Sequence, residues 1–226
     1  MLWEAFRMLA GFDPELWDII GRSLLVSVLA VSMAGVVAIP AGAVLGLARQ
    51  TRFTVLIIST ANALMGLPPV VAGLLIYMIL TRNGPLGQYQ LLFTVTAMVI
   101  VQLVLALPII FSLTNSAVRA VDPGITDAAR TLGASKVKAA LAVLREARGG
   151  LVTAIAAGLG RVLAEVGAVM LVGGNIAGRT RVMTTAIMLE TRQGNFEMAL
   201  GLGLVLIIIS LGLNFLIGTL SRQGVS

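Results

Sequence analysis

Long apolar segments alternate with short polar ones along the chain. Each apolar segment exceeds the roughly 20 residues that an α-helix needs to cross the hydrocarbon layer of a membrane. Because lipid cannot hydrogen-bond an open backbone, helices are the expected structure of these segments. We therefore predict an all-α, polytopic membrane protein in which residues 1–226 form one transmembrane domain. About five crossing helices are expected, near residues 23–48, 53–80, 91–117, 151–173 and 198–220, with longer polar segments at 118–150 and 174–197.

The first of these polar segments has the residues of a bend between two short helices. The sequence Asp-Pro-Gly at 122–124 is typical of a turn. Thr126 can cap a helix that begins at Asp127, and Gly133 can end that helix in the left-handed conformation. Ser135 can cap a second helix. We predict a compact bend formed by two helices that meet at the glycine.

The first of the two short helices has a small apolar face, formed by Ala128, Ala129 and Leu132. Such a face would fit a groove on another protein. Basic residues follow it at Lys136, Lys138, Arg145 and Arg148. The spacing alone leaves a second interpretation open, in which this segment is an ordinary cytoplasmic loop with solvated charges.

Composition supports a membrane protein. The chain has 226 residues, of which 58% are hydrophobic and only 12% are charged, whereas a soluble domain has about 25% charged residues. The net charge of +6 could indicate nucleic-acid binding, but the basic residues lie between apolar segments rather than on one soluble face. There is no Cys and no His, which excludes thiol catalysis, disulfides and Cys or His metal sites. We predict no metal site and no nucleic-acid partner.

The distribution of basic residues predicts the orientation in the inner membrane. With the N-terminus outside, the inner segments hold Arg49, Arg52, Arg119, Arg130, Lys136, Lys138, Arg145, Arg148 and Arg222. The outer segments hold fewer, namely Arg7, Arg22, Arg82, Arg179, Arg181 and Arg192. Positive residues favour the cytoplasmic side, so the segment 118–150 and the C-terminus are expected there. An acidic N-terminus before a long apolar segment does not fit a cleaved signal peptide.

Residues 127–135, DAARTLGAS, resemble the EAA motif of ABC importer permeases, in which Glu-Ala-Ala is followed by three residues and Gly. Asp127 stands where the family usually has Glu, so its carboxylate has a shorter reach. Residues 160–168, GRVLAEVGA, are similar to a stretch of the oxyanion permeases for molybdate, tungstate and sulfate. Short motifs at 64–71, with 84–87, and between 173 and 191 most resemble the tungstate-type permeases.

The resemblance implies a type I ABC importer permease whose segment 118–150 holds a coupling helix. Its ATPase-contacting residues would be Asp127, Ala128, Ala129, Arg130, Leu132, Gly133 and Ser135. Two copies of this chain would assemble with two cytoplasmic ATPase subunits. An extracytoplasmic binding protein would deliver the oxyanion, which by this resemblance is tungstate. ATP and Mg would be bound by the ATPase. The chain itself has no G-x-x-x-x-G-K-[ST] loop, so we expect no cofactor and no enzymatic activity of its own.

Two charges fall inside the fourth apolar segment. Arg161 lies near mid-membrane, and Glu165 is four residues further on, so the two would share a helix face. Charges at a helix centre cost roughly 2.5–3.5 kcal/mol each on insertion scales, and they are expected to face protein or water. Two roles are open. Arg161 could meet the passing oxyanion, or it could form a structural ion pair with Glu165 or with a neighbouring helix. We predict that this helix lines the translocation path or gate, with Gly160, Arg161, Ala164 and Glu165 at that place.

Small residues and prolines add packing information. Ala156, Gly160, Ala164 and Ala168 are spaced as a ladder that allows close helix approach. Gly42 and Gly46 have the same spacing in the first helix. Pro40, Pro68, Pro69 and Pro108 are expected to interrupt the first three helices. Bent packing and a hinge for alternating access are both consistent with these prolines.

The outer segment 174–197 is too polar to cross a membrane. Residues 182–191 could form a short surface helix. We predict that Arg179, Arg181 and Met183 contact the binding protein, although a simple interfacial loop is equally consistent with the pattern.

Two other functions fit less well. A gradient-driven secondary transporter is expected to have inverted repeats, into which five helices do not divide evenly. An intramembrane enzyme would need catalytic groups, but the chain has no His, no Cys and no G-x-S-x-G.

Overall fold

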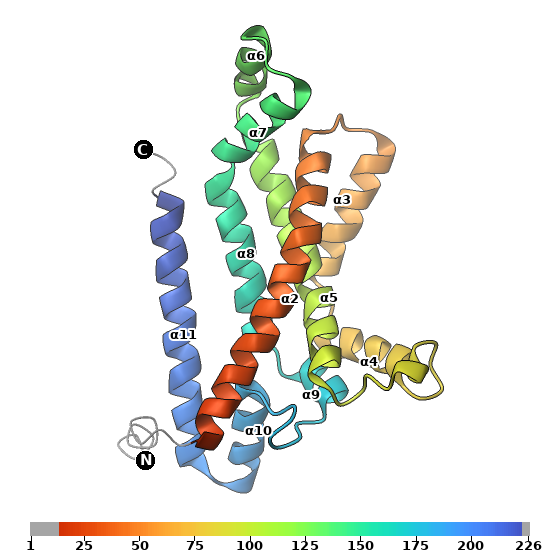
Figure 1. The fold of residues 1–226 in the computed structure, drawn as a ribbon, viewed down its shortest axis with the longest axis vertical. Helices are drawn as coiled ribbons and strands as arrows, with labels where there is room; N and C mark the ends of the chain where they lie inside the picture. The colour runs from red at the N-terminus through yellow and green to blue at the C-terminus, as the bar shows by residue number, and fades with distance from the viewer. Residues whose placement is uncertain (1–13, 223–226) are drawn as a thin grey trace.

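The computed structural model describes residues 14–222, and in this range the chain is helical without strands (Figure 1). The helices are α2 (Pro14–Leu47), α3 (Arg52–Met65), α4 (Pro69–Leu80), α5 (Val95–Arg119), α6 (Pro123–Thr131), α7 (Lys136–Glu146), α8 (Arg148–Leu163), α9 (Gly167–Gly173), α10 (Met183–Gln193) and α11 (Phe196–Arg222), with a 3-10 turn η1 at Gly87–Tyr89. The predicted all-α fold is confirmed. The N-terminal end, which we expected outside the membrane, precedes the described residues.

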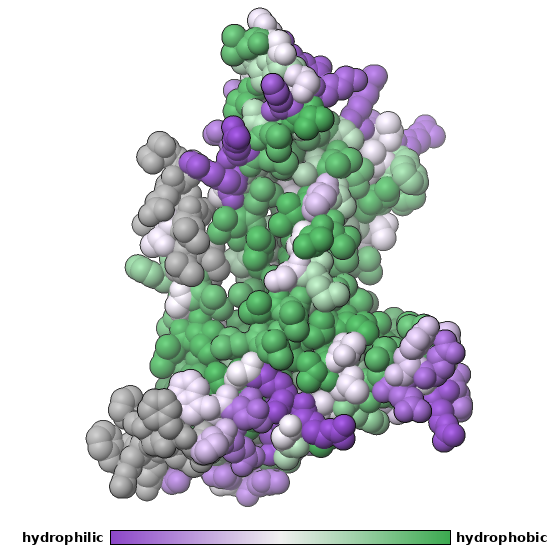
Figure 2. Space-filling model, in the orientation of Figure 1, coloured by the Kyte–Doolittle hydropathy of each residue, from purple (hydrophilic) through white to green (hydrophobic). Residues whose placement is uncertain are grey.

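The chain runs back and forth along the long axis of the molecule. α6 and α7 project at one end, and α9 and α10 lie at the other, where α2 begins (Figure 1). α11 returns toward the end that carries α6 and α7. An apolar band separates polar surfaces at the two ends (Figure 2). This arrangement is the one expected of a membrane protein whose polar ends face water on opposite sides.

The first helix is longer than predicted, because α2 begins at Pro14 and not near residue 23. Its additional turns include Leu16, Ile19 and Ile20, which are buried in one cluster with Met183 of α10 and Leu202 of α11. Exposed charges surround these apolar positions, so hydropathy alone does not reveal this part of the helix. Packing against two other helices stabilises it.

The second and fourth apolar segments are not single straight helices. α3 and α4 meet at an angle of 103°, and α8 and α9 meet at 62°. Three described helices are long and apolar enough to span a membrane, and there are five spans if each bent pair counts as one. The predicted continuous helices at 53–80 and 151–173 are therefore corrected to two bent pairs of helices.

The prolines explain one of the two bends. Pro68 precedes α4, and Pro69 is its first residue, a position where the missing N–H costs nothing. Pro40 and Pro108 lie inside the continuous helices α2 and α5, so the prediction that they interrupt these helices is wrong. The bend between α8 and α9 contains no proline and depends on Glu165, described below.

Close packing of α2 on α5 forms the centre of the bundle. A Cβ atom on Gly42 would lie 2.7 Å from the carbonyl oxygen of Phe111, and one on Gly46 would lie 2.8 Å from Cγ1 of Val118. Asn115 Nδ2 donates a hydrogen bond of 3.2 Å to the Gly42 carbonyl. The glycine pair is thus a true helix contact, at a distance that no larger residue allows.

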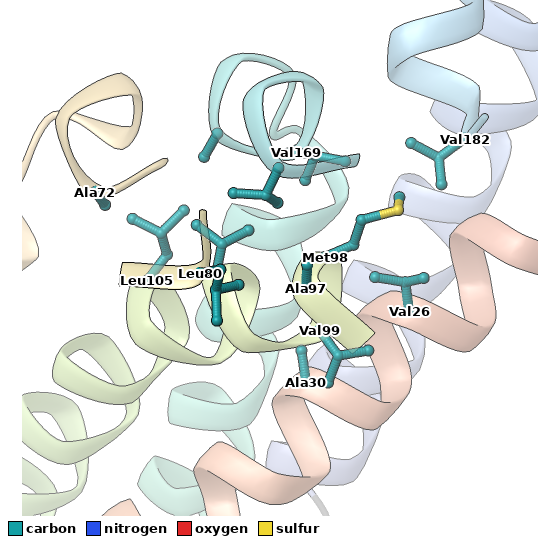
Figure 3. Close-up of a cluster of buried hydrophobic side chains, with 13 residues drawn as sticks. Val26, Ala30, Ala72, Leu80, Ala97, Met98, Val99, Leu105, Val169 and Val182 are labelled. Atoms are coloured by element: carbon teal, nitrogen blue, oxygen red, sulfur yellow. The ribbon is translucent and has the colours of Figure 1, made fainter. Parts of the chain in front are cut away.

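The second helices of the two bent pairs, α4 and α9, pack together. A Cβ atom on Gly73 of α4 would lie 2.7 Å from Cα of Ala168 in α9. Both helices contribute to the buried cluster drawn in Figure 3, together with α2 and α5. The bends therefore bring α4 and α9 into one packed unit.

Candidate functional site

α6, α7 and the residues between them (123–146, hereafter the elbow) form the bend predicted at this place. Gly133 has φ 82, and Ser135 Oγ accepts a hydrogen bond from Lys138 N. Both predictions are confirmed. The predicted cap at Thr126 is wrong, because Asp122 Oδ1 caps the helix through Gly124 N at 2.8 Å. Pro123 at the first helical position has a φ already suited to a helix, which moves the start four residues upstream.

The elbow has a fixed base and a free tip. Val143 and Ala147 are buried with Ala43 of α2 and Val118 of α5. At the tip, Leu132 is 88% exposed. Asp127, Ala128, Arg130, Gly133 and Ser135 are also exposed, whereas Ala129 is half-buried. The structure thus brings the predicted coupling residues to one projecting surface.

The elbow is joined directly to the helix that carries Arg161. α7 ends at Glu146, and α8 begins at Arg148. The 16 residues of α8 span about 24 Å at 1.5 Å per residue. α8 also packs along α5. A displacement of the elbow can therefore be transmitted along α8 to the middle of the molecule.

The end of α8 is held by Glu165, which lies between α8 and α9 and is 5% exposed. Its Oε1 accepts a hydrogen bond of 2.9 Å from Ala168 N at the start of α9. Its Oε2 lies 3.6 Å from Nη1 of Arg161. Its backbone carbonyl accepts a hydrogen bond of 2.7 Å from Thr184 Oγ1 of α10. One residue thus connects α8, α9 and α10.

Arg161 and Glu165 do not share one continuous helix, because α8 ends at Leu163. Their predicted proximity nevertheless holds, since the ion pair spans the bend. The Arg161 side chain remains 33% exposed. Gly160 and Ala164 are exposed beside it. The small-residue ladder therefore faces outward along α8, but its last member, Ala168, is buried in α9 and does not continue it.

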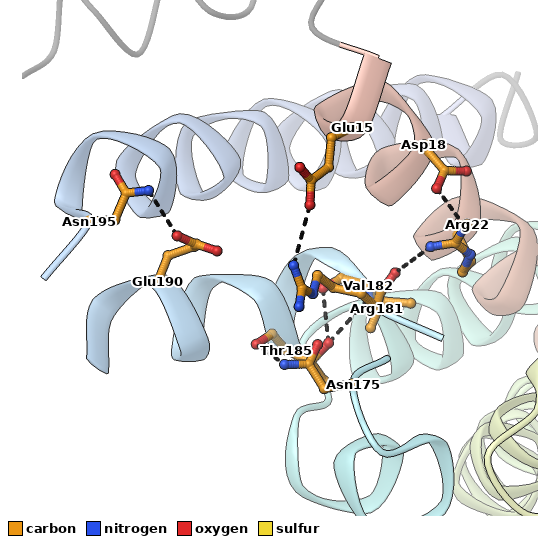
Figure 4. Close-up of polar contacts among 9 residues, drawn as sticks. All are labelled: Glu15, Asp18, Arg22, Asn175, Arg181, Val182, Thr185, Glu190 and Asn195. Atoms are coloured by element: carbon orange, nitrogen blue, oxygen red, sulfur yellow. Dashed lines mark hydrogen bonds and ion pairs between the residues drawn. The ribbon is translucent and has the colours of Figure 1, made fainter. Parts of the chain in front are cut away.

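The predicted contacts for a binding protein lie at the opposite end from the elbow. Arg179 is exposed. Arg181 is mostly buried and lies 3.3 Å from Oε1 of Glu15, and its carbonyl accepts a hydrogen bond from Arg22 (Figure 4). Met183 is 1% exposed, so its predicted surface contact is corrected. It begins the predicted helix α10, whose first turn packs against α2 and α11, and Met183 N donates a hydrogen bond of 2.6 Å to Ser23 Oγ.

A depression of about 860 Å³ lies at this same end, where α4 and η1 meet. Its polar lining includes Tyr77, Thr81, Arg82, Gln88 and Gln90. Sequence reasoning missed this depression, whose lining also includes Gly84 and Gly87. These glycines allow the chain to fold back on α4, since a Cβ on Gly84 would lie 2.2 Å from the Met78 carbonyl oxygen.

Sequence reasoning also missed buried polar residues within the apolar segments. Gln102 of α5 donates from Nε2 to the Val162 carbonyl at 3.2 Å, and Ser23 and Thr184 make the bonds given above. A polar residue inside an apolar segment is the signal that could have found them. No group of three or more metal-ligating acidic residues occurs in residues 14–222.

Known proteins resemble this chain in sequence and in structure. The model of the family described as "Binding-protein-dependent transport system inner membrane component" matches residues 38–223. The tungstate uptake system permease protein TupB of Peptoclostridium acidaminophilum is 39% identical, with 97% of this chain and 96% of that protein covered. A probable anion ABC transporter permease protein of Haloferax volcanii is 42% identical, with 86% and 85% covered.

The fold is also found in solved transporters. A chain of the inward-facing MetNI methionine ABC transporter has a TM-score of 0.74 at 17% identity, with 94% of this chain and 98% of that chain covered. A chain of an amino acid ABC transporter has a TM-score of 0.63 at 19% identity, with 96% and 98% covered. The fold is that of type I ABC importer permeases. By the match over residues 38–223, the chain belongs to the family of inner membrane components of binding-protein-dependent transport systems.

Proposed function

We propose that this protein is the permease subunit of an ABC importer for an oxyanion, and that the oxyanion is tungstate. The assignment of tungstate as the substrate rests on the similarity to the tungstate uptake permease of Peptoclostridium acidaminophilum, which extends over almost the whole of both chains. Molybdate is the second candidate, because a putative molybdenum permease of Bacillus subtilis is 30% identical over 82% of this chain.

The elbow is the proposed docking surface for the ATPase. Its exposed tip and packed base suit a surface that receives force from another protein. The chain has no nucleotide-binding loop of the G-x-x-x-x-G-K-[ST] type, so ATP and Mg are bound by the partner. In this proposal two copies of the chain pair with two ATPase subunits, the elbow and C-terminus lie in the cytoplasm, and the N-terminus lies outside.

The exposed face of α8 is the proposed wall of the translocation path. Gly160 and Ala164 leave room beside Arg161 for a second copy of the chain or for a passing anion. We assign Arg161 and Glu165 a structural role at the bend. The geometry favours it, because Glu165 is already bonded to α9 and α10 and partly neutralises the guanidinium.

The proposed contact for the binding protein is the outer end, where Arg82 and Arg179 are exposed on separate loops. Arg82 lines the depression and so offers a cation inside a hollow surface. An acidic side chain of the binding protein would complement it.

Purification of the assembled complex tests this function. The account expects an ATPase to co-purify with the chain, and ATP hydrolysis in liposomes to rise when tungstate-loaded binding protein is added. If only molybdate-loaded or sulfate-loaded binding protein stimulates ATP hydrolysis, that anion is the substrate in place of tungstate, and the protein is still an ABC importer permease. Uptake that proceeds without any ATPase would reject the class in favour of a gradient-driven carrier.

A further inference from the structure

A small polar cavity lies where four helices meet, next to the end of α8. It is lined by Ser23, Ser27, Gln102, Val162, Leu163, Val182, Met183 and Thr184, from α2, α5, α8 and the start of α10. The space open to the centre of a water molecule is about 10 Å³. Roughly this much space, 10–15 Å³, is needed to hold one water. The cavity is therefore of a size for a single small polar molecule.

One acceptor in the lining has no partner in the described part of the chain. Gln102 is 4% exposed. Its Nε2 is bonded to the Val162 carbonyl, but its Oε1 makes no hydrogen bond. Buried side-chain oxygens in native proteins are almost always paired, with protein or with ordered water. The unpaired oxygen belongs to a residue that lines the cavity, so a small molecule in the cavity would give this oxygen its missing partner.

Further polar groups in the lining can complete the coordination. The hydroxyl of Ser23 donates to the Ile19 carbonyl and accepts from Met183 N. The hydroxyl of Thr184 donates to the Glu165 carbonyl. A hydroxyl oxygen has two lone pairs, so both can accept a further bond. Ser27, 2% exposed, adds a third hydroxyl. A buried water needs two to four polar partners, and the lining offers that number.

We infer that one water molecule binds in this cavity, donating a hydrogen bond to Gln102 Oε1 and a second to a hydroxyl oxygen of the lining, with Ser27 among its partners. A metal cation is a poorer fit, because the lining contains no carboxylate. The water links α5 to α2, and the last turn of α8 is tied to the same place by the hydrogen bond between Gln102 Nε2 and the Val162 carbonyl. It is a structural water next to the bend between α8 and α9, where the Arg161–Glu165 ion pair lies.

A structure of the assembled transporter, at a resolution that shows ordered water, is the first test. We expect density within hydrogen-bonding distance of Gln102 Oε1. A cavity without density, or with Gln102 turned to another protein group, overturns the inference.

A double-mutant cycle gives an independent readout. Ser27→Ala should shorten the half-life of the solubilised complex at a fixed temperature by roughly two- to tenfold, as expected for one lost hydrogen bond. In a Gln102→Leu background, where the water has lost its main partner, the same change should have a clearly smaller effect.

The matched control is Ser112→Ala on α5, because Ser112 is a buried serine like Ser27 but does not line the cavity. Its effect should be the same with and without Gln102→Leu. Equal effects of Ser27→Ala in both backgrounds would contradict a bridging water. Neither readout depends on which anion is transported or on whether the chain works with an ATPase.

Discussion

Glu165 carries more structural connections than its buried carboxylate alone suggests. One oxygen caps α9, the other faces Arg161, and the backbone carbonyl receives Thr184. The bend between α8 and α9 has no proline, and Glu165 supplies the Ala168 amide with the acceptor that a continuous helix would have provided four residues earlier. The residue is thus a positioning residue for the bend.

Substitutions of Glu165 should separate the cap from the charge. Glu165→Gln keeps an oxygen for Ala168 N but removes the ion pair, whereas Glu165→Ala removes both. A lost helix cap costs about 1 kcal/mol, which for a chain of this size is a fall of ~2–4 °C in melting temperature. We expect Glu165→Ala to melt lower than Glu165→Gln in a thermal scan of the purified complex. Equal melting temperatures would contradict the claim that the hydrogen bond from Ala168 N to Glu165 stabilises the bend.

Arg161→Gln distinguishes the two roles of the arginine. A structural role predicts poor assembly, measured as the yield of complex after size-exclusion chromatography. Normal assembly with lost tungstate uptake would instead place the arginine in the path.

The four-residue spacing of Arg161 and Glu165 was enough to predict their contact from the sequence. It was not enough to predict that Glu165 caps α9, because a helix break without Pro or Gly at its centre has no local signature. The surroundings of Met183 were equally hidden. Its side chain is buried by residues of α2 and α11, and its amide is bonded to Ser23, which is 160 residues away in the chain.

Hydropathy predicted which segments form apolar helices, but it did not predict where those helices bend. Apolar composition reports burial in lipid or protein, and it is unchanged when a helix turns by 103° between α3 and α4. The elbow was better predicted, since Gly133 and Ser135 act through local backbone geometry. Its first cap was misplaced because Asp122 and Pro123 form a stronger start than Thr126.

The geometry of the elbow should matter for coupling to the ATPase. Gly133→Ala places a side chain at φ 82, which costs roughly 1–2 kcal/mol. We expect it to reduce ATPase stimulation by the loaded binding protein. Gly194→Ala is the matched control, because Gly194 has φ 80 and equally open surroundings at the other end of the molecule. A similar loss of stimulation in both variants would point to general instability.

The whole molecule has two polar ends of different character, and α8 runs from the end with the elbow toward the middle (Figure 1). The elbow projects at one end, and α4 lies toward the other (Figure 1). The end of α4 lines the depression that contains Arg82. The bent spans place α4 and α9 as one unit between the depression and the Arg161–Glu165 pair. A partner that binds at either end therefore contacts elements that pack against the same bend between α8 and α9.

Charge reversal at the outer end tests where the binding protein contacts the permease. Arg82→Glu should raise the concentration of binding protein needed for half-maximal ATPase stimulation by roughly tenfold, as a close interfacial charge pair is lost. Arg179→Glu, on the other outer loop, is the control and should have a smaller effect. The reverse order would favour the 174–182 loop over the depression.

The central claim is that the elbow lies in the cytoplasm and docks on a separate ATPase. The chain contains no cysteine, so Leu132→Cys gives a single labelling site at the tip of the elbow. Labelling by a membrane-impermeant maleimide measures both the side of the membrane and the contact. We expect Leu132→Cys to react in inside-out vesicles stripped of ATPase, to be protected when the ATPase is added back, and to stay unlabelled in intact cells. Reaction from outside intact cells, or reaction unchanged by the ATPase, would contradict the account.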